Sequence, residues 1–318
     1  MKKQTAIIVL AAGKSTRMKS EKPKVLHPLC GRPVLSYVCD LVKGLKPDRA
    51  VFVLGHKHEQ IRPLIPQGMK VVLQRRMCGT ADAVKAAFSA LRGFSGEVVV
   101  LYGDTPLLQK ETINKLLKHH RAHRFAVTLL TAKPAQPKGY GRILRDKLYG
   151  ICGIAEEKDA TDFQRNIKEV NTGIMCFSRA ALTSVLKKIR PNNRKKEYYL
   201  TDAVHLLYKK GELIGNIGIG DVSETLGINS RDELSIAHRV MHKRITTALM
   251  KEGVTIIDPA SVYIAYGVRI GPDTTVYPFT VIEGNVTVGR RASIGPFAHV
   301  RAGSRIKEGS CVGRAHDG

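Results

Sequence analysis

Two cations near the N-terminus, Arg17 and Lys24, follow a glycine, Gly13, in a pattern suited to binding phosphate. They come after residues 4–10 (QTAIIVL), an apolar run without polar alternation that predicts a buried strand. Glycine lets the backbone approach a ligand closely, and amide N–H groups and cations can then hold an anion. Because open α/β sheets bind phosphates where a strand ends in such a loop, we expect a phosphate-binding turn here.

The triplet Gly13-Lys14-Ser15 looks like the end of a P-loop but does not complete that motif. A P-loop needs another glycine five residues before the glycine of this triplet. That position is Ile8, inside the predicted strand, so the P-loop interpretation is excluded.

The elements that must position this turn alternate along the first two thirds of the chain. Further buried strands are expected at 49–55, 69–73 and 98–101, with helical stripes between them. Their spacing fits βαβ units and predicts an α/β domain with a doubly wound, mostly parallel sheet. Each strand runs into polar or glycine-bearing residues, namely Gln74 with the turn 78–82, and then 102–106. Since the carboxyl ends of parallel strands share one edge, these motifs are expected to meet at the ligand-binding edge.

The last third of the chain follows another pattern. After a long amphipathic helix expected at 232–253, a β-branched aliphatic residue stands at every sixth position from Ile264 to Val312, nine in all. A small or β-branched residue lies two positions before each of them. A strict period of six predicts a parallel β-helix in which three repeats make one turn. A stack of about three turns has open ends, so we expect it to hold the protein as a homotrimer.

The composition limits the class of protein. The net charge is +25, but the basic residues are spread along the chain and aromatic residues make up only 6% of it, with no Trp. Nucleic-acid binding would favour a clustered patch interleaved with aromatics, so a basic surface that attracts nucleotides is the preferred interpretation. No segment approaches the roughly 18 apolar residues of a membrane span. Six scattered cysteines without a CxxC pair predict a reduced, cytoplasmic chain.

Several motifs occur here in one order and together carry a resemblance. They are 10–24 (LAAGKSTRMKSEKPK), 102–108 (YGDTPLL), 139–143 (GYGRI), 153–162 (GIAEEKDATD), 170–174 (VNTGI), 197–202 (EYYLTD) and the six-residue repeat. The chain resembles the bifunctional bacterial N-acetylglucosamine-1-phosphate uridylyltransferase / glucosamine-1-phosphate acetyltransferase family. The resemblance implies a nucleotide-diphospho-sugar transferase type of sheet and a left-handed β-helix. The expected domains are a nucleotidyltransferase domain at 1–231, a connecting helix at 232–253 and a truncated β-helix at 254–318.

The resemblance also implies a reaction and a set of site residues. UTP and N-acetylglucosamine 1-phosphate would give UDP-N-acetylglucosamine and pyrophosphate, with Mg²⁺ held by Asp104 and Asn229. The residues implied as catalytic are Arg17, Lys24 and Asp104. Those implied to bind the nucleotide are Leu10, Ala11, Ala12, Gly13, Lys24, Gln74, Gly79, Thr80, Tyr102 and Gly103. Those implied to bind the sugar are Gly141, Glu156, Asn171 and Asn229, with Thr201 nearby; Glu157 is the alternative to Glu156.

Two departures from the family pattern bear on specificity. Met77 replaces a frequent glutamine, and Asp82 stands where histidine is common, so the resemblance does not fix which nucleotide base is bound. In the β-helix, Arg301 matches one acetyl-acceptor contact, but the other residues of that site are missing, so we expect no acetyltransferase activity. The alternatives are a pyrophosphorylase for another nucleotide or hexose 1-phosphate, or an inactive regulatory subunit of the same fold.

Overall fold

The computed structural model describes residues 4–313, and the chain divides into two compact units. The first comprises residues 1–26 and 34–229, and the second comprises residues 27–33 and 230–318. All the predicted nucleotide, sugar and metal residues belong to the first unit. The assignment of the short segment 27–33 to the second unit was not indicated by any sequence pattern.

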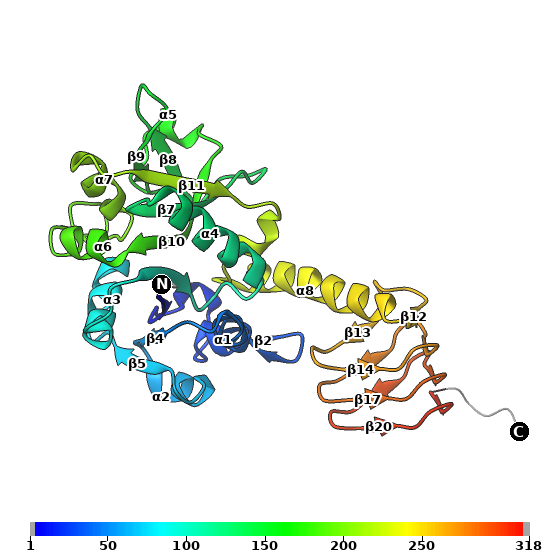
Figure 1. Ribbon diagram of the computed structural model, residues 1–318. Helices are drawn as coiled ribbons and strands as arrows, with labels where there is room; N and C mark the ends of the chain where they lie inside the picture. Colours follow the sequence, from blue (N-terminus) through cyan, green and yellow to red (C-terminus); the bar gives the residue numbers. More distant parts are fainter. Residues whose placement is uncertain (1–3, 314–318) are drawn as a thin grey trace, which may run out of the picture. The chain divides into compact units, whose positions relative to one another are not determined.

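The first unit is built on a nine-stranded sheet whose main path runs β11-β7-β10-β6-β1-β4-β5 (Figure 1). Strand β10 is antiparallel to both of its neighbours on this path, whereas the other adjacent pairs are parallel. The mostly parallel sheet predicted from the spacing is therefore confirmed. The strands are β1 (Thr5–Ala11), β4 (Arg49–Leu54), β5 (Lys70–Leu73), β6 (Glu97–Tyr102), β7 (Val127–Ala132), β10 (Val170–Ser178) and β11 (Ile214–Gly218), with β8 (Gly141–Arg145) and β9 (Ile151–Ala155) off the path.

The reversed strand has a consequence for the binding edge. Because β10 runs against its neighbours, its first residues lie at the edge where the other strands end. Asn171, the second residue of β10, is thereby brought to the same edge as the residues that follow β1 and β6. Strand β10 thus contributes its first residues to that edge, whereas the parallel strands contribute the residues that follow their last ones.

Alternate residues of the strands pack against helices on opposite faces of the sheet. On one face Ile7 and Val9 of β1 belong to a core shared with α1 (Val34–Leu45) and α4 (Lys110–His123). On the other face Ile8 and Leu10 belong to a core shared with helices from later in the chain. These helices are α3 (Thr80–Ala87), α6 (Arg179–Leu186) and α7 (Asp202–Lys209). Burial on both faces explains why the strands read as continuous apolar runs.

Several short helices complete the first unit. They are α2 (His58–Ile61) and α5 (Asp162–Arg165), with 3₁₀ helices η1 (Thr16–Met18), η2 (Lys24–Leu26), η3 (Arg62–Leu64), η4 (Phe88–Leu91) and η5 (Val222–Thr225). Helix α5 was not predicted, although a capping box marks its start. Thr161 Oγ1 accepts a hydrogen bond from the Gln164 amide, and Gln164 Oε1 accepts one from the Thr161 amide.

The second unit begins with the long helix that the amphipathic pattern predicted. Helix α8 (Arg231–Lys251) is capped by Ser230, whose hydroxyl accepts a hydrogen bond from the Glu233 amide. A small hairpin of β2 (Pro28–Leu29) and β3 (Arg32–Pro33) packs on this helix. His238 holds the hairpin, because its Nδ1 accepts from the Cys30 amide at 3.4 Å and its Nε2 contacts the Pro28 carbonyl at 3.2 Å.

The predicted parallel β-helix follows α8 as three stacked faces of two-residue strands (Figure 1). Residue 263 pairs with 281 and 269 with 287, an offset of 18 residues, which is three repeats of six. The repeating aliphatic residues from Ile264 to Val300 are buried in one continuous core. The strands are β12 (Thr255–Ile256), β13 (Tyr263–Ile264), β14 (Arg269–Ile270), β15 (Thr275–Val276), β16 (Val281–Ile282), β17 (Thr287–Val288), β18 (Ser293–Ile294), β19 (His299–Val300), β20 (Arg305–Ile306) and β21 (Cys311–Val312).

One strand of the stack was not predicted. Strand β12 pairs with β15 and buries Ile256, but Ile264 comes eight positions after Ile256 instead of six. The longer spacing breaks the period of six, so the periodicity alone did not find this strand.

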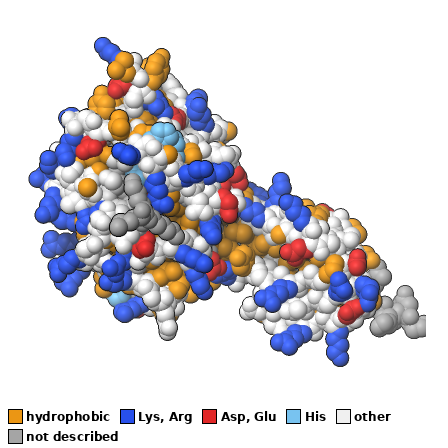
Figure 2. Space-filling view, in the orientation of Figure 1, with side chains coloured by type: hydrophobic (Ala, Val, Ile, Leu, Met, Phe, Trp, Pro, Cys, Tyr) orange, Lys and Arg blue, Asp and Glu red, His pale blue; other side chains and the backbone are white. Residues whose placement is uncertain are grey.

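On the face shown in Figure 2, basic side chains are spread over both units, with acidic side chains among them. On the face shown, no single cluster of Lys and Arg stands apart from the rest. Within residues 4–313, no helix has the length and apolar character that crossing a bilayer requires.

Candidate active site

The phosphate turn after β1 is organised by a residue that the sequence motifs did not single out. The Ser15 hydroxyl donates to the Gly13 carbonyl at 3.4 Å and accepts from the Lys24 amide at 3.2 Å. Ser15 has left-handed backbone dihedrals, with φ at 57°, which turns the chain sharply into η1. Arg17 lies exposed on η1. The turn therefore carries one predicted cation, Arg17, and is fastened to the backbone of the other, Lys24.

The two predicted metal ligands converge on the side chain of Lys24. Its ammonium donates to Asp104 Oδ2 in an ion pair and to Asn229 Oδ1 at 2.7 Å. Asp104 follows β6, and the Asp104 carbonyl accepts from the Ile228 amide at 2.9 Å, which ties the two ligand segments together. Lys24 and Asp104 side chains are only 16% and 13% exposed.

This arrangement fits the predicted divalent cation. A carboxylate oxygen and an amide oxygen, both hard donors, point at one position that already holds a positive charge. Within residues 4–313, no group of three His, Cys, Asp or Glu side chains is arranged to hold a metal ion. Two protein ligands would leave the other coordination positions to phosphate oxygens and water.

Gln74 follows β5 and is locked by neighbours on α3. Its Nε2 donates to the Gly79 carbonyl at 3.1 Å and to Asp82 Oδ2 at 2.8 Å, and the residue is 7% exposed. Gly79 packs so tightly that a Cβ there would lie 2.5 Å from the Tyr198 carbonyl oxygen, and its φ of 118° also favours glycine. The predicted base-reading turn is therefore a rigid structure.

The turn 78–81 is bonded directly to the segment 198–201. The Tyr198 amide donates to the Cys78 carbonyl at 2.7 Å, and the Ala81 amide donates to the Tyr198 carbonyl at 2.9 Å. The Thr80 hydroxyl accepts from the Leu200 amide at 2.9 Å. Thr80, predicted to contact the base, thus has its side chain in a bond that joins two loops.

The predicted sugar residues form a second group at the same edge. Asn171 of β10 lies opposite Gly141 of β8 in the antiparallel register. Glu156, just after β9, accepts a hydrogen bond from the Thr201 hydroxyl at 2.9 Å. A Cβ on Gly141 would lie 3.5 Å from Glu156 Oε2, so this carboxylate stands next to the Gly141–Asn171 pair.

The choice between Glu156 and Glu157 can be argued from their partners. Glu157 pairs with the buried Arg142 at 2.7 Å and accepts from the Gly139 amide at 3.1 Å, so it braces the strand β8 and the loop before it. Burial raises the pKa of Glu156, although the hydrogen bond from Thr201 opposes the shift. The hydrogen bonds and ion pairs of Glu157 lower its pKa. Of the two, Glu156 is the carboxylate that lies next to the predicted sugar residue Gly141.

Tyr102, at the end of β6, connects the two groups. Its ring packs against Gly173 of β10, where an added Cβ would lie 2.7 Å from the ring. Burial raises the pKa of Tyr102, and the negative charges of Glu156 and Asp104 raise it further. The phenol of Tyr102 therefore stays protonated near two carboxylates, Glu156 of the predicted sugar group and Asp104 of the predicted metal pair. Gly103 is held by a hydrogen bond from its amide to the Leu10 carbonyl at 2.9 Å.

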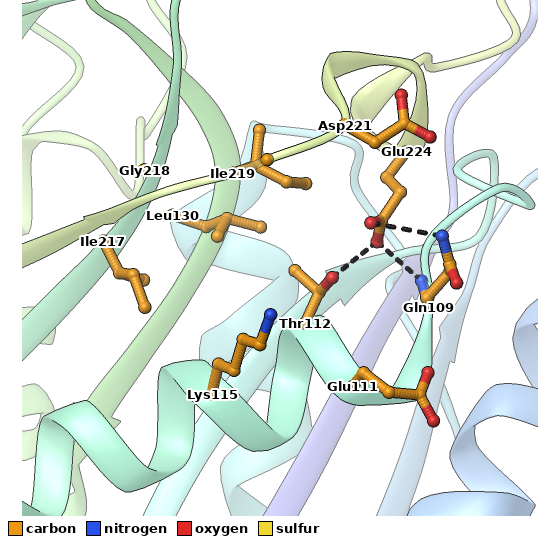
Figure 3. Close-up of a pocket in the computed structure, with 11 residues that line it drawn as sticks. Gln109, Glu111, Thr112, Lys115, Leu130, Ile217, Gly218, Ile219, Asp221 and Glu224 are labelled. Atoms are coloured by element: carbon orange, nitrogen blue, oxygen red, sulfur yellow. Dashed lines mark hydrogen bonds between the residues drawn. The ribbon is translucent and has the colours of Figure 1, made fainter.

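A buried carboxylate that sequence reasoning missed anchors the loop carrying Asn229. Glu224 of η5 accepts from the Gln109 amide at 2.9 Å, the Gln109 side chain at 3.3 Å and the Thr112 hydroxyl at 2.7 Å (Figure 3). These bonds fasten η5 to the start of α4. Glu224 and Asp221 also line a cavity of about 270 Å³ between α4 and the end of β11, which includes none of the predicted site residues.

Comparison with known families agrees with this architecture. Residues 7–170 match the MobA-like NTP transferase domain, and residues 267–302 match the bacterial transferase hexapeptide model of six repeats. The matched domain, together with the mostly parallel sheet, identifies the protein as a nucleotidyltransferase.

The chain is similar along almost its whole length to curated bifunctional proteins. It is 39% identical to the bifunctional protein GlmU of Halalkalibacterium halodurans, covering 96% of this chain and 74% of that protein. It is 44% identical to GlmU of Pelotomaculum thermopropionicum, covering 97% and 75%, and 41% identical to GlmU of Alkaliphilus metalliredigens, covering 91% and 63%. The chain belongs to the GlmU family.

Solved structures agree on the fold of the first unit. A UDP-glucose pyrophosphorylase complexed with UDP-glucose superposes with a TM-score of 0.62 at 15% identity, covering 76% of this chain and 99% of that one. The apo form of UDP-glucose pyrophosphorylase gives a TM-score of 0.59 at 16% identity.

Proposed function

We propose that this nucleotidyltransferase makes UDP-N-acetylglucosamine and pyrophosphate from UTP and N-acetylglucosamine 1-phosphate. The observation that carries the proposal is the convergence of Asp104 Oδ2 and Asn229 Oδ1 on the Lys24 ammonium at the binding edge of the sheet. This triad unites three residues that the family resemblance had assigned separately to phosphate and metal binding. The Gly141–Asn171 pair and Glu156 supply the amide and carboxylate that suit an N-acetyl group and sugar hydroxyls.

The reaction needs positioning and charge stabilisation more than proton transfer. A phosphate oxygen of the sugar phosphate attacks the α-phosphorus of UTP, a new P–O bond forms, and the bond to pyrophosphate breaks. The nucleophile is already an anion, so no protein base has to activate it. Mg²⁺ held by Asp104 and Asn229 would neutralise phosphate charge as the reaction proceeds.

The remaining residues act on the two substrates. Lys24, whose ammonium bonds to both proposed metal ligands, would neutralise the phosphates near the α-phosphorus, and exposed Arg17 would meet the leaving pyrophosphate. The backbone from Leu10 to Gly13 would contact the nucleotide, and Tyr102 and Gly103 would line the pocket. Gln74 and the turn formed by Gly79 and Thr80 would face the base.

The test is pyrophosphate release from UTP and N-acetylglucosamine 1-phosphate, with and without Mg²⁺, by the wild type and Asp104→Ala. We expect Asp104→Ala to lower turnover by a factor of about 10² or more, because it removes a ligand to the cation that meets the transition-state charge. Asp162→Ala, which removes a side chain that is 99% exposed, is the matched control and should leave turnover unchanged. Unchanged turnover in a folded Asp104→Ala protein would refute the metal assignment.

Other substrates decide between the proposal and its alternatives. Faster turnover with dTTP or with another hexose 1-phosphate would identify a different pyrophosphorylase. No turnover with any nucleotide would favour an inactive regulatory subunit of this fold.

Three expectations from the sequence belong to the same proposal. We infer that the β-helix holds the protein as a homotrimer, because a short stack of two-residue strands buries little core of its own and is stabilised by packing against further copies. The absence of acetyltransferase activity stays a prediction, tested by acetyl-CoA-dependent acetylation of glucosamine 1-phosphate. The cytoplasmic location also stays a prediction, supported by six free cysteine thiols.

A further inference from the structure

Asp82 stands at a position where the family resemblance does not expect an aspartate, and its carboxylate bonds to the predicted base-reading residue. It lies in the first turn of α3, and its Oδ2 accepts from Gln74 Nε2 at 2.8 Å. The Gly79 carbonyl accepts from the same nitrogen at 3.1 Å. The backbone N–H of Gln74 also donates to the Leu54 carbonyl at 2.8 Å, so both the main chain and the side chain of Gln74 are held by hydrogen bonds.

These bonds decide which atom of the Gln74 amide is left for a ligand. A glutamine side chain has two N–H donors on one side and one carbonyl oxygen on the other. Here both donors face acceptors, a carboxylate and a carbonyl. Rotating the amide by 180° would lose both hydrogen bonds and place Oε1 against two oxygen atoms. The carboxylate makes that rotation especially unfavourable, because hydrogen bonds to charged groups are the stronger ones.

We propose that Asp82 is a specificity-determining positioning residue, which fixes Gln74 so that it offers the base a hydrogen-bond acceptor and no donor. This inference rests on the proposed function, in which Gln74 faces the base. An acceptor matches the ring N3–H of a keto pyrimidine such as uracil. It rejects cytosine, whose N3 is itself an acceptor, because two acceptors would then face each other.

A purely structural role for Asp82 makes a different prediction. An acidic residue in the first turn of a helix favours the helix through its dipole, and this effect alone would explain an aspartate at this position. Loss of that effect lowers stability but treats all nucleotides alike. A change in the preference between UTP and CTP is therefore the readout that separates the two roles.

The experiment measures kcat/KM for UTP and for CTP with the full chain, at saturating N-acetylglucosamine 1-phosphate. For Asp82→Ala we expect the UTP-to-CTP ratio to fall by about tenfold, within the range measured for coupled neighbours, mainly through a higher KM for UTP. Asp82→Asn keeps a side-chain oxygen that can accept from Gln74, so it should retain most of the preference. Glu59→Ala, which removes an exposed carboxylate from α2 in the same unit, is the control and should keep the wild-type ratio.

A second pair of variants tests whether Asp82 acts through Gln74. In a Gln74→Ala background, Asp82→Ala should change the UTP-to-CTP ratio no further, because no amide is left to orient. An unchanged ratio in Asp82→Ala alone, or an equal fall in both backgrounds, would overturn the proposal.

Calorimetric binding of UTP and CTP keeps this test separate from the proposed reaction. If the wild type binds UTP in preference to CTP but releases no pyrophosphate, the proposed function fails and the effect of Asp82→Ala on binding preference still decides the role of Asp82. If the wild type binds both nucleotides equally, the acceptor proposal is wrong.

Discussion

Replacing Glu224 with alanine should destabilise the first unit markedly and loosen the loop that carries Asn229. Glu224 is 5% exposed and accepts three hydrogen bonds from Gln109 and Thr112 at the start of α4. Two of them, at 2.7 and 2.9 Å, join a carboxylate to neutral donors, and each is worth about 1.5 kcal/mol. Water can reach the freed donors of the exposed Gln109 and the half-buried Thr112, and hydrogen bonds to water then recover part of this free energy. We therefore expect a loss of about 3 kcal/mol, including the weaker third bond and the helix dipole.

Thermal unfolding gives the readout for this loss. For a unit of this size, about 3 kcal/mol corresponds to a fall in Tm of roughly 6–12 °C. Glu224→Gln keeps an acceptor oxygen and should lose less than half as much. Glu111→Ala is the matched control, because it removes an exposed acidic side chain from the first turn of the same helix. Its loss should stay near 0.5 kcal/mol, about the value of the dipole interaction alone.

The same variant should also affect the cation site. Asn229 lies five residues after Glu224, and the Ile228 amide between them bonds to the Asp104 carbonyl. Loosening η5 should therefore raise the Mg²⁺ concentration needed for half-maximal turnover in Glu224→Ala. If Glu224→Ala melts within about 1 °C of Glu111→Ala, the carboxylate cluster does not anchor the loop and the reasoning fails.

Two further predictions concern pH and assembly. Burial, and next the charge of Glu156, raise the pKa of Asp202 to about 6 from its ordinary value of 3.8. The folded protein therefore keeps a proton that the unfolded chain releases, and this contribution to stability is lost as pH rises from about 4 to 6. Asp202→Asn should then gain in Tm relative to the wild type at pH 7.5 but not at pH 4; an equal difference at both values would contradict the shift. For assembly, light scattering at micromolar concentration should give three times the chain mass of 35.0 kDa, and a monomeric mass would rule out the trimer.

The elements that the sequence predicted well are those with a clear period. The strands β1 and β6, which end just before Gly13 and Asp104, are buried on both faces, and the second unit repeats every six residues, so the hydrophobic pattern alone was enough. The helix α8 was equally clear from its amphipathic face and from Gly253, the glycine expected to end it.

The parts that were missed depend on contacts between distant residues. The hairpin 28–33 is held by His238, more than 200 residues later, and the strand β12 breaks the repeat spacing. No local pattern carries such information. The reversal of β10, which brings Asn171 to the binding edge, is likewise a property of strand order and not of the strand's own residues.

Within the candidate site, the motifs indicated which residues to expect, but the hydrogen-bond partners of those residues follow only from the three-dimensional structure. Thr80 is expected to contact the base as part of the Gly79–Thr80 turn, and the structure adds that its hydroxyl accepts a hydrogen bond from the Leu200 amide. Glu156 and Glu157 are adjacent in sequence and could be told apart only by the ion pair of Glu157 with Arg142. Asp82 was noted only as a departure from a family pattern, and its bond to Gln74 is what gives it a proposed role.

The bonds between the turn 78–81 and the segment 198–201 have a thermodynamic consequence. They make one connected structure of the loop beside Gln74 and the loop whose Thr201 bonds to Glu156. Because the two loops are bonded into one body, a nucleotide that stabilises the position of the first loop also stabilises the position of the second, which the proposed sugar phosphate would contact. Linkage makes this coupling reciprocal, so the two substrates should strengthen each other's binding by the same factor, whichever one binds first.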